Sequence, residues 1–261
     1  MNFVITLILA TAAVAASLIH LDQELVRYWD FVAFAMVFGG TLAVSAAVIP
    51  WRNYKLIFSI IRKLLFNSTV SKKLFLEKCI GTIQSYKAGG YVEIKSVSTP
   101  ADQILADGYE LLNLGIKKDK VEHILEERIH TYMKDSYNVA TSIRSLAKYP
   151  PAFGLAGTVF GLVELMRGVS QGLPVKETGI KMAIALVATL YGLMVANLFI
   201  SPAGEQATKM IKDEENMCDI ALQAILLAAG DDGLLESQEF LNSMVLKKER
   251  IQLGGMQQGA A

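Results

Sequence analysis

The sequence has 261 residues with 25 basic and 25 acidic side chains, so its net charge is zero and indicates no nucleic-acid partner. Apolar residues make up 52% of the chain and charged residues only 19%, which is typical of a membrane protein with sizeable soluble parts. The two cysteines are far apart, and no metal-ligand spacing, phosphate loop or nucleophile motif is present. These features give no indication of a metal site, a nucleotide site or a nucleophilic active site.

The first part of the chain contains two uncharged runs, which predict two membrane-spanning helices. Residues 1–19 are just long enough to span a bilayer, and residues 31–51 form the second run. Because no basic residue precedes the first run, we favour a retained span over the alternative of a cleaved signal peptide. Residues 20–30 are then a short external loop.

Residues 52–148 are too polar to span a membrane and are predicted to form a helical cytoplasmic domain. Six basic residues and no acid follow the second run before Glu77, namely Arg52, Lys55, Arg62, Lys63, Lys72 and Lys73. Such an excess of basic residues indicates the cytoplasmic side of a membrane. The N-terminus is therefore also expected on the cytoplasmic side.

The last two spans are predicted at residues 149–167 and 180–204, and residues 168–179 are predicted to join them as an external loop. Pro202 is expected to break the fourth helix where it leaves the membrane, because proline lacks a backbone N–H. Residues 205–261 are predicted to form a cytoplasmic tail that is helical except at its end. The prediction is an all-α protein with four spans and both termini in the cytoplasm.

Small residues recur along one side of each of the last two spans. This side is formed in the third span by Pro150, Gly154, Gly157, Gly161 and Gly168, and in the fourth by Ala185, Thr189, Gly192, Ala196 and Ala203. Small residues allow helix backbones to approach closely in lipid, so these two faces could pack together or against a third helix. Thr158 lies at the edge of the first face, where its hydroxyl requires a polar partner.

No predicted span has a carboxylate near its centre, although coupled passage of protons or sodium usually requires one. Glu164 lies near the outer end of the third span, and the simpler interpretation is that it pairs there with Arg167. Two alternatives follow. Either the chain is not an ion pathway, or a partner protein supplies the acid.

Several short segments occur in an order that is characteristic of a known family. They are residues 39–42 (GGTL), 87–91 (KAGGY), 107–112 (DGYELL), 123–129 (HILEERI), 151–158 (PAFGLAGT), 188–192 (ATLYG) and 199–202 (FISP). On these segments the chain resembles, over nearly its whole length, the flagellar stator proteins of the MotA/PomA family within the MotA/TolQ/ExbB superfamily.

The resemblance implies a non-enzymatic, ion-conducting stator subunit of the flagellar motor in the bacterial inner membrane, with transported H+ or Na+ and no metal or other cofactor. Such subunits form a homo-oligomeric ring, thought to be a pentamer, around two MotB/PomB-type subunits whose membrane aspartate carries the ion. The resemblance assigns Thr158 and Thr189 to the ion pathway and Pro151 and Pro202 to conformational change. Helix packing and simple helix termination are the alternative roles of these residues.

The resemblance also implies that the cytoplasmic domain pushes on the flagellar rotor switch protein FliG through charged residues. Lys87 matches the family's basic position before the glycine turn, but Lys95 occupies the position at which the family has an acid. Rotor contact is therefore assigned to Lys87, Glu93 and Lys95, with Asp107 and Glu110 as alternatives.

Two other kinds of protein remain as alternatives. One is a TolQ/ExbB-like energiser of outer-membrane work or gliding, although those relatives usually have three spans. The other is a structural four-helix scaffold or a transporter that acts without a partner. The identity of a co-encoded partner would distinguish the first from a stator, and ion flux through the purified chain alone would support the transporter.

Overall fold

The structure is a computed structural model that describes residues 2–20, 29–66 and 71–252, and every regular element in these ranges is a helix. The all-α prediction is therefore confirmed for the described residues. Most of the predicted loop 20–30 and the end of the predicted tail lie outside them. The chain divides into two compact units, unit 1 (Met1–Asn67 and Tyr137–Thr208) and unit 2 (Ser68–Ser136 and Lys209–Ala261).

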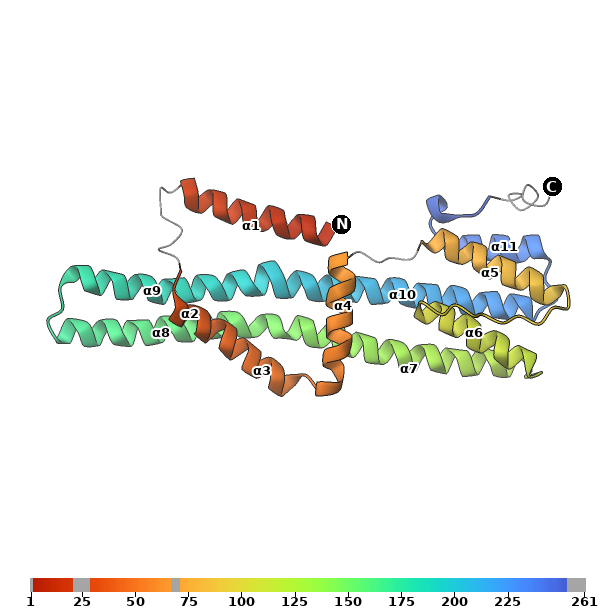
Figure 1. Ribbon diagram of the computed structural model, residues 1–261, viewed down its shortest axis with the longest axis horizontal. Helices are drawn as coiled ribbons and strands as arrows, with labels where there is room; N and C mark the ends of the chain where they lie inside the picture. Colours follow the sequence, from red (N-terminus) through yellow and green to blue (C-terminus); the bar gives the residue numbers. More distant parts are fainter. Residues whose placement is uncertain (1, 21–28, 67–70, 253–261) are drawn as a thin grey trace. The chain divides into compact units, whose positions relative to one another are not determined.

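Unit 1 is built around a pair of long helices that lie side by side (Figure 1), α8 (Tyr149–Ser170) and α9 (Val175–Met194). The second predicted span contacts both helices and consists of α2 (Phe31–Phe34), a π-helical segment η2 (Ala35–Gly39) and α3 (Gly40–Val48). The unit also contains α1 (Asn2–His20), the short helix η3 (Trp51–Asn53), α4 (Tyr54–Phe66) and the 3₁₀ turn η4 (Leu146–Lys148).

Three of the described helical segments contain an apolar stretch that is long enough to cross a membrane. These segments are Phe31–Val48, Lys118–Ser170 and Val175–Ala228. Within α1 a shorter apolar helical stretch covers Ile8–Ser17. Asp30 starts the α2 segment as its N-cap, because its carboxylate accepts the Ala33 N–H at 2.6 Å. The sequence features that predicted membrane helices therefore correspond to helices in the structure.

The prediction that Pro202 breaks the fourth helix is wrong. Helical structure continues from α9 through the π-helical segment η5 (Val195–Ile200) into α10 (Ser201–Ala228), and Pro202 is the second residue of α10. A proline ring crowds the carbonyl four residues before it and leaves that carbonyl without its usual donor. The wider π-helical turn, in which the Ser201 N–H donates to the Ala196 carbonyl, lies directly before the proline and accommodates this defect.

The connection between α8 and α9 is shorter than the predicted loop of residues 168–179. Helix α8 continues to Ser170, and α9 begins at Val175. Gly172 has a φ of +74°, and the Leu173 N–H donates to the Gly168 carbonyl at 3.1 Å, which ends α8 with a glycine cap. Residues 175–179 of the predicted loop instead belong to the first turns of α9, because charged side chains at a helix end do not prevent helix formation.

Unit 2 contains α5 (Lys72–Lys87), α6 (Pro100–Asn113), α11 (Leu234–Ser243), the short helix η6 (Lys247–Glu249) and parts of α7 (Lys118–Ser145) and α10. Helix α5 packs against α11 (Figure 1). The core of this unit is apolar, and its largest fully buried side chains include Leu76, Leu105, Tyr109, Leu125 and Ile225. This burial stabilises the unit through the hydrophobic effect.

Candidate functional site

The two faces of small residues on α8 and α9 pack against each other. A Cβ atom added to Gly161 would lie 2.3 Å from the Ala185 Cβ, and one added to Gly154 would lie 2.8 Å from the Ala188 carbonyl oxygen. A Cβ atom at Gly192 of α9 would lie 2.4 Å from the Pro150 carbonyl oxygen of α8. The backbones therefore approach so closely that only glycine fits at these three positions.

The second span packs on the same pair of helices. A Cβ atom at Gly40 would lie 2.5 Å from the ring of Phe153 in α8, and one at Gly157 would lie 2.6 Å from the Ala188 Cβ and 3.4 Å from the Met36 Sδ. Of the other small residues on the predicted face of the fourth helix, Ala185 and Ala196 are also buried. The close contact thus involves three helices, with the α8–α9 pair at its centre.

Thr158 and Thr189 meet at this contact, one from each helix. Their hydroxyl oxygens are within hydrogen-bond distance of each other. The Gly154 carbonyl oxygen lies 3.2 Å from both hydroxyl oxygens, and the Ala185 carbonyl oxygen lies 3.3 Å from the Thr158 hydroxyl. Four oxygens from two helices therefore form one polar cluster, which we call the oxygen cluster (Thr158 Oγ1, Thr189 Oγ1, Gly154 O and Ala185 O).

The number of hydroxyl protons in the oxygen cluster limits the hydrogen bonds that the cluster can donate. Two hydroxyls supply two protons, so one proton can join the threonines and the other can be donated to a carbonyl. All further interactions of the cluster must use oxygen lone pairs, and both threonine side chains are only partly buried. Such a group of oxygens can accept a hydrogen bond from water or contact a hard cation. The glycines explain how it forms, because they let the α9 hydroxyl reach an α8 carbonyl.

Glu164 lies toward the C-terminal end of α8 and has two cationic neighbours. Its carboxylate oxygens are 3.7 Å from the Arg167 guanidinium and 3.7 Å from the Lys181 ammonium of α9. The sequence predicted the first of these contacts but not the second, because Lys181 lies in the predicted fourth span, beyond the predicted loop of residues 168–179. The Glu164 side chain is 57% exposed, so these ion pairs contribute little to stability.

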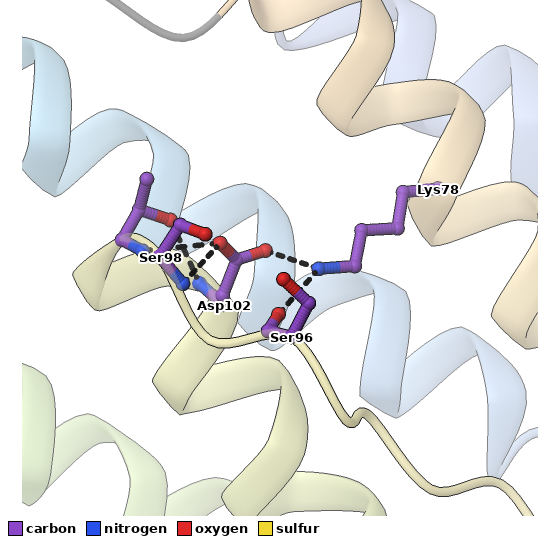
Figure 2. Close-up of polar contacts among 5 residues, drawn as sticks. Lys78, Ser96, Ser98 and Asp102 are labelled. Carbon is purple, nitrogen blue, oxygen red and sulfur yellow. Dashed lines mark hydrogen bonds and ion pairs between the residues drawn. The ribbon is translucent and has the colours of Figure 1, made fainter.

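In unit 2 a second polar cluster surrounds Asp102 at the start of α6 (Figure 2). Its carboxylate accepts hydrogen bonds from the Lys78 ammonium, the Thr99 hydroxyl at 2.9 Å and the Ser98 N–H at 3.2 Å. The Asp102 N–H in turn donates to the Thr99 hydroxyl at 3.1 Å, which completes a capping box. Thr99, Pro100 and Asp102 are the sequence signature of such a helix start, so this feature was available from the sequence.

Asp102 should make the stability of unit 2 depend on acid pH. Burial alone would raise the pKa of this carboxyl, but the hydrogen bonds from Lys78, Thr99 and Ser98 outweigh it and hold the pKa below its ordinary value. The stabilisation is therefore present above the unfolded pKa near ~4 and is lost as the pH falls through the lower native pKa. We expect Asp102→Asn to destabilise the unit by about 1–3 kcal/mol at neutral pH and to weaken this acid dependence.

Limited proteolysis of the intact protein between pH 3 and pH 8 would measure this effect on unit 2. Asp107→Asn on the same helix is the matched control, because Asp107 makes a more exposed pair with Arg128 at 2.5 Å. Such a pair contributes at most about 1 kcal/mol. Equal protease sensitivity of the two variants at neutral pH would contradict the prediction.

The charged residues predicted to face a rotor differ in their surroundings. Lys87 donates to the Gly230 carbonyl oxygen at 3.0 Å and to the Asp232 carbonyl oxygen. Glu93 and Lys95 are exposed, and no hydrogen bond or ion pair is described for either. Of the two alternatives, Asp107 is engaged by Arg128, whereas Glu110 is exposed. Among the described contacts, none therefore joins Lys87, Glu93 and Lys95 to one another.

Together, these observations define an all-helical membrane protein with an oxygen cluster between closely packed helices. The part of the chain that the structure describes contains no group of three or more His, Cys, Asp or Glu side chains that could hold a metal. Cys79 and Cys218 are buried free thiols, and burial raises the pKa of Cys79 to about 12, which makes it unreactive.

Residues 96–219 match the model of the MotA/TolQ/ExbB proton channel family. Motility protein A of Borreliella burgdorferi is 30% identical over 123 residues, and the match covers 46% of each chain. The chain thus spans about half the length of this curated relative. Two solved structures share the fold, that of C. jejuni MotAB and that of the flagellar MotAB stator complex from Bacillus subtilis.

The C. jejuni structure has a TM-score of 0.86 at 14% identity, covering 97% of this chain and 99% of that chain. The Bacillus structure has a TM-score of 0.83 at 18% identity, covering 95% of this chain and 98% of that chain. At these identities the likeness establishes the fold. The family model covers residues 96–219, slightly less than half of the chain, so this part of the chain is similar to the MotA/TolQ/ExbB proton channel family.

Proposed function

We propose that the chain is an ion-conducting stator subunit of the bacterial flagellar motor, which couples proton or sodium flow to torque on the rotor. The observation that supports this most directly is the oxygen cluster formed by Thr158, Thr189 and the two carbonyls. It provides polar ligands between helices of membrane-spanning length, where an isolated polar group would be costly.

The chain cannot complete such a pathway alone, because residues 149–163 and 182–204 contain no carboxylate. We infer that the missing acid comes from a MotB/PomB-type partner, whose membrane aspartate would load and release the ion. Both solved structures described above are structures of MotAB, which supports a partner of this kind. The proposal includes a ring of this chain, a pentamer, around two partner chains.

The proposed topology has four spans, α1, α2 to α3, α8, and α9 with the start of α10. Both termini and unit 2 then lie in the cytoplasm, which agrees with the basic residues that follow the second span. Helix α4, with a polar and an apolar side, follows that span and would lie at the inner membrane surface. Unit 2 would contact the rotor protein FliG through exposed charges such as Glu93 and Lys95.

Loss of the chain is expected to stop swimming while leaving flagella on the cell. Restored swimming after expression of the gene in a deletion strain would support the proposal. Normal swimming in the deletion strain, once other stator genes are also removed, would contradict it and favour an energiser of outer-membrane work. Swimming speed measured against external sodium, with a protonophore control, would then identify the ion.

Pro151 and Pro202 are proposed to allow the conformational change that generates torque. Pro151 lies in the first turn of α8, where a missing N–H has no cost, and Pro202 follows the π-helical segment η5. Alanine at Pro202 would supply the missing N–H and favour an ordinary α-helix, and alanine at Pro151 would release the fixed φ angle of proline. We therefore expect Pro151→Ala and Pro202→Ala to abolish swimming while membrane insertion is unchanged. Normal swimming by both variants, at equal protein levels in the membrane, would exclude this role.

A further inference from the structure

Helix α4 follows the second span after a sharp change of direction. The two residues after α3, Ile49 and Pro50, are extended rather than helical, with ψ angles of 121° and 137°. Because a residue before proline is sterically kept out of the helical region, the chain turns here. Within unit 1, α4 then runs across the direction of α8 and α9 (Figure 1). A helix that runs across membrane-spanning helices lies along the plane of the membrane.

One side of η3 and α4 alternates between aromatic and basic residues. Its members are Trp51, Lys55, Phe58 and Arg62, whose spacings of four, three and four residues place them on one side of a helix. We call these four residues the aromatic–basic stripe. All four are exposed, Trp51 at 82% and Phe58 at 71%. Ile60, on the opposite side of α4, is buried, so the stripe faces away from the rest of unit 1.

The two cations of the stripe have no acidic neighbour in the sequence. Residues 31–76 contain no Asp or Glu, and none of the described contacts engages Lys55 or Arg62. At the surface of a bilayer, aromatic rings enter the boundary of the acyl chains, and the charged ends of Lys and Arg remain among the headgroups. The stripe therefore complements a surface that carries negative charge and has an apolar layer directly below it.

We propose that the aromatic–basic stripe selectively binds anionic phospholipids of the inner leaflet, with Lys55 and Arg62 at the headgroup phosphates and Trp51 and Phe58 at the acyl chains. The proposal rests on the topology within the proposed function, in which α4 lies at the inner membrane surface, but not on ion flow or rotor contact. Orientation of the chain alone would require only an excess of basic residues on the cytoplasmic side, at any spacing. Binding of lipid also requires the rings and cations to share one exposed stripe.

Quenching of Trp51 fluorescence by brominated lipids measures which lipid lies beside the stripe. The chain has two tryptophans, so Trp29→Phe leaves Trp51 as the only reporter. The full-length Trp29→Phe protein is reconstituted into vesicles of phosphatidylglycerol and phosphatidylcholine at equal mole fractions, in which either one lipid or the other carries bromine. We expect phosphatidylglycerol to bind beside Trp51 roughly fivefold or more tightly than phosphatidylcholine, because basic residues near the surface attract anionic lipid.

Variants of the two cations test whether the stripe causes this preference. Lys55→Gln combined with Arg62→Gln should abolish the preference, while brominated phosphatidylcholine still quenches Trp51 and so shows that α4 remains in the membrane. Lys55→Arg combined with Arg62→Lys keeps both charges and should keep the preference. The matched control, Lys73→Gln combined with Lys120→Gln, removes the same charge from exposed positions of unit 2 and should leave the preference unchanged.

Equal quenching by the two brominated lipids in the Trp29→Phe protein would overturn the proposal, and so would a preference that persists without Lys55 and Arg62. Absence of quenching by either lipid would also overturn it, because the stripe would then be covered by protein. A stator whose Trp51 shows no lipid preference would still be needed for swimming. Failure of the lipid site and failure of the proposed function are therefore measured separately.

Discussion

Gly192→Ala is expected to separate α8 from α9 and to reduce swimming to a small fraction of normal. A Cβ atom at this position would lie 2.4 Å from the Pro150 carbonyl oxygen and 3.1 Å from the Pro151 Cα. Both are backbone atoms in the first turn of α8, so no side-chain rotation can relieve the clash. Forcing an extra methyl group into such a contact costs about 1–3 kcal/mol. Thermal denaturation of the purified complex and swimming speed would measure the two effects.

The matched control is Gly179→Ala, on the same helix. A Cβ atom at Gly179 would meet nothing within 4 Å, and the position is exposed. Because alanine favours a helix over glycine by about 1 kcal/mol, this variant should be neutral or slightly more stable. If Gly192→Ala were as stable and as motile as Gly179→Ala, the close α8–α9 contact would not be essential.

Thr158→Val and Thr189→Val are expected to reduce ion flow strongly while leaving the fold intact. Valine keeps the shape of threonine but removes one oxygen from the oxygen cluster. The remaining hydroxyl still has an acceptor, because the Gly154 carbonyl oxygen lies 3.2 Å from either hydroxyl. We therefore expect little loss of stability but at least a roughly tenfold loss of ion flux, since an ion or its water loses one polar contact.

Serine variants distinguish the role of the threonine hydroxyl from the role of its methyl group. Thr158→Ser and Thr189→Ser keep the oxygen and remove only a methyl group, so they should retain most of the flux and of the swimming speed. A role in helix packing alone predicts the reverse order, with the valine variants close to normal. Flux that is normal in both valine variants would therefore exclude the two hydroxyls from the ion pathway.

The sequence was sufficient to predict which faces of the last two spans are small, because a spacing of three and four residues identifies one side of a helix. It left open whether these faces meet each other. Whether the two faces meet depends on how closely the two helices approach each other, and the residue spacing along one helix does not determine that distance. The carbonyls of Gly154 and Ala185 were missed for a related reason, since backbone atoms become ligands only when a neighbouring helix comes close enough.

Two predictions were wrong because the neighbouring structure outweighed a local sequence preference. Proline usually ends a helix, but the π-helical turn before Pro202 accommodates the ring, and no residue pattern predicts where such a turn forms. Residues 175–179 were predicted to belong to the external loop, whereas they form the first turns of α9. The contact of Lys87 with Gly230 joins residues more than a hundred positions apart, and a single sequence gives no signal for it.

The central claim is that this chain conducts ions only together with a partner that supplies a membrane carboxylate. The most direct measurement is proton and sodium flux into proteoliposomes that contain the chain alone, the chain with its MotB-type partner, or the chain with a partner whose membrane aspartate is replaced by asparagine. We predict flux only with the intact partner, and a loss of that flux in the Thr158→Val variant. Flux through the chain alone, or through the complex with the asparagine partner, would contradict the account.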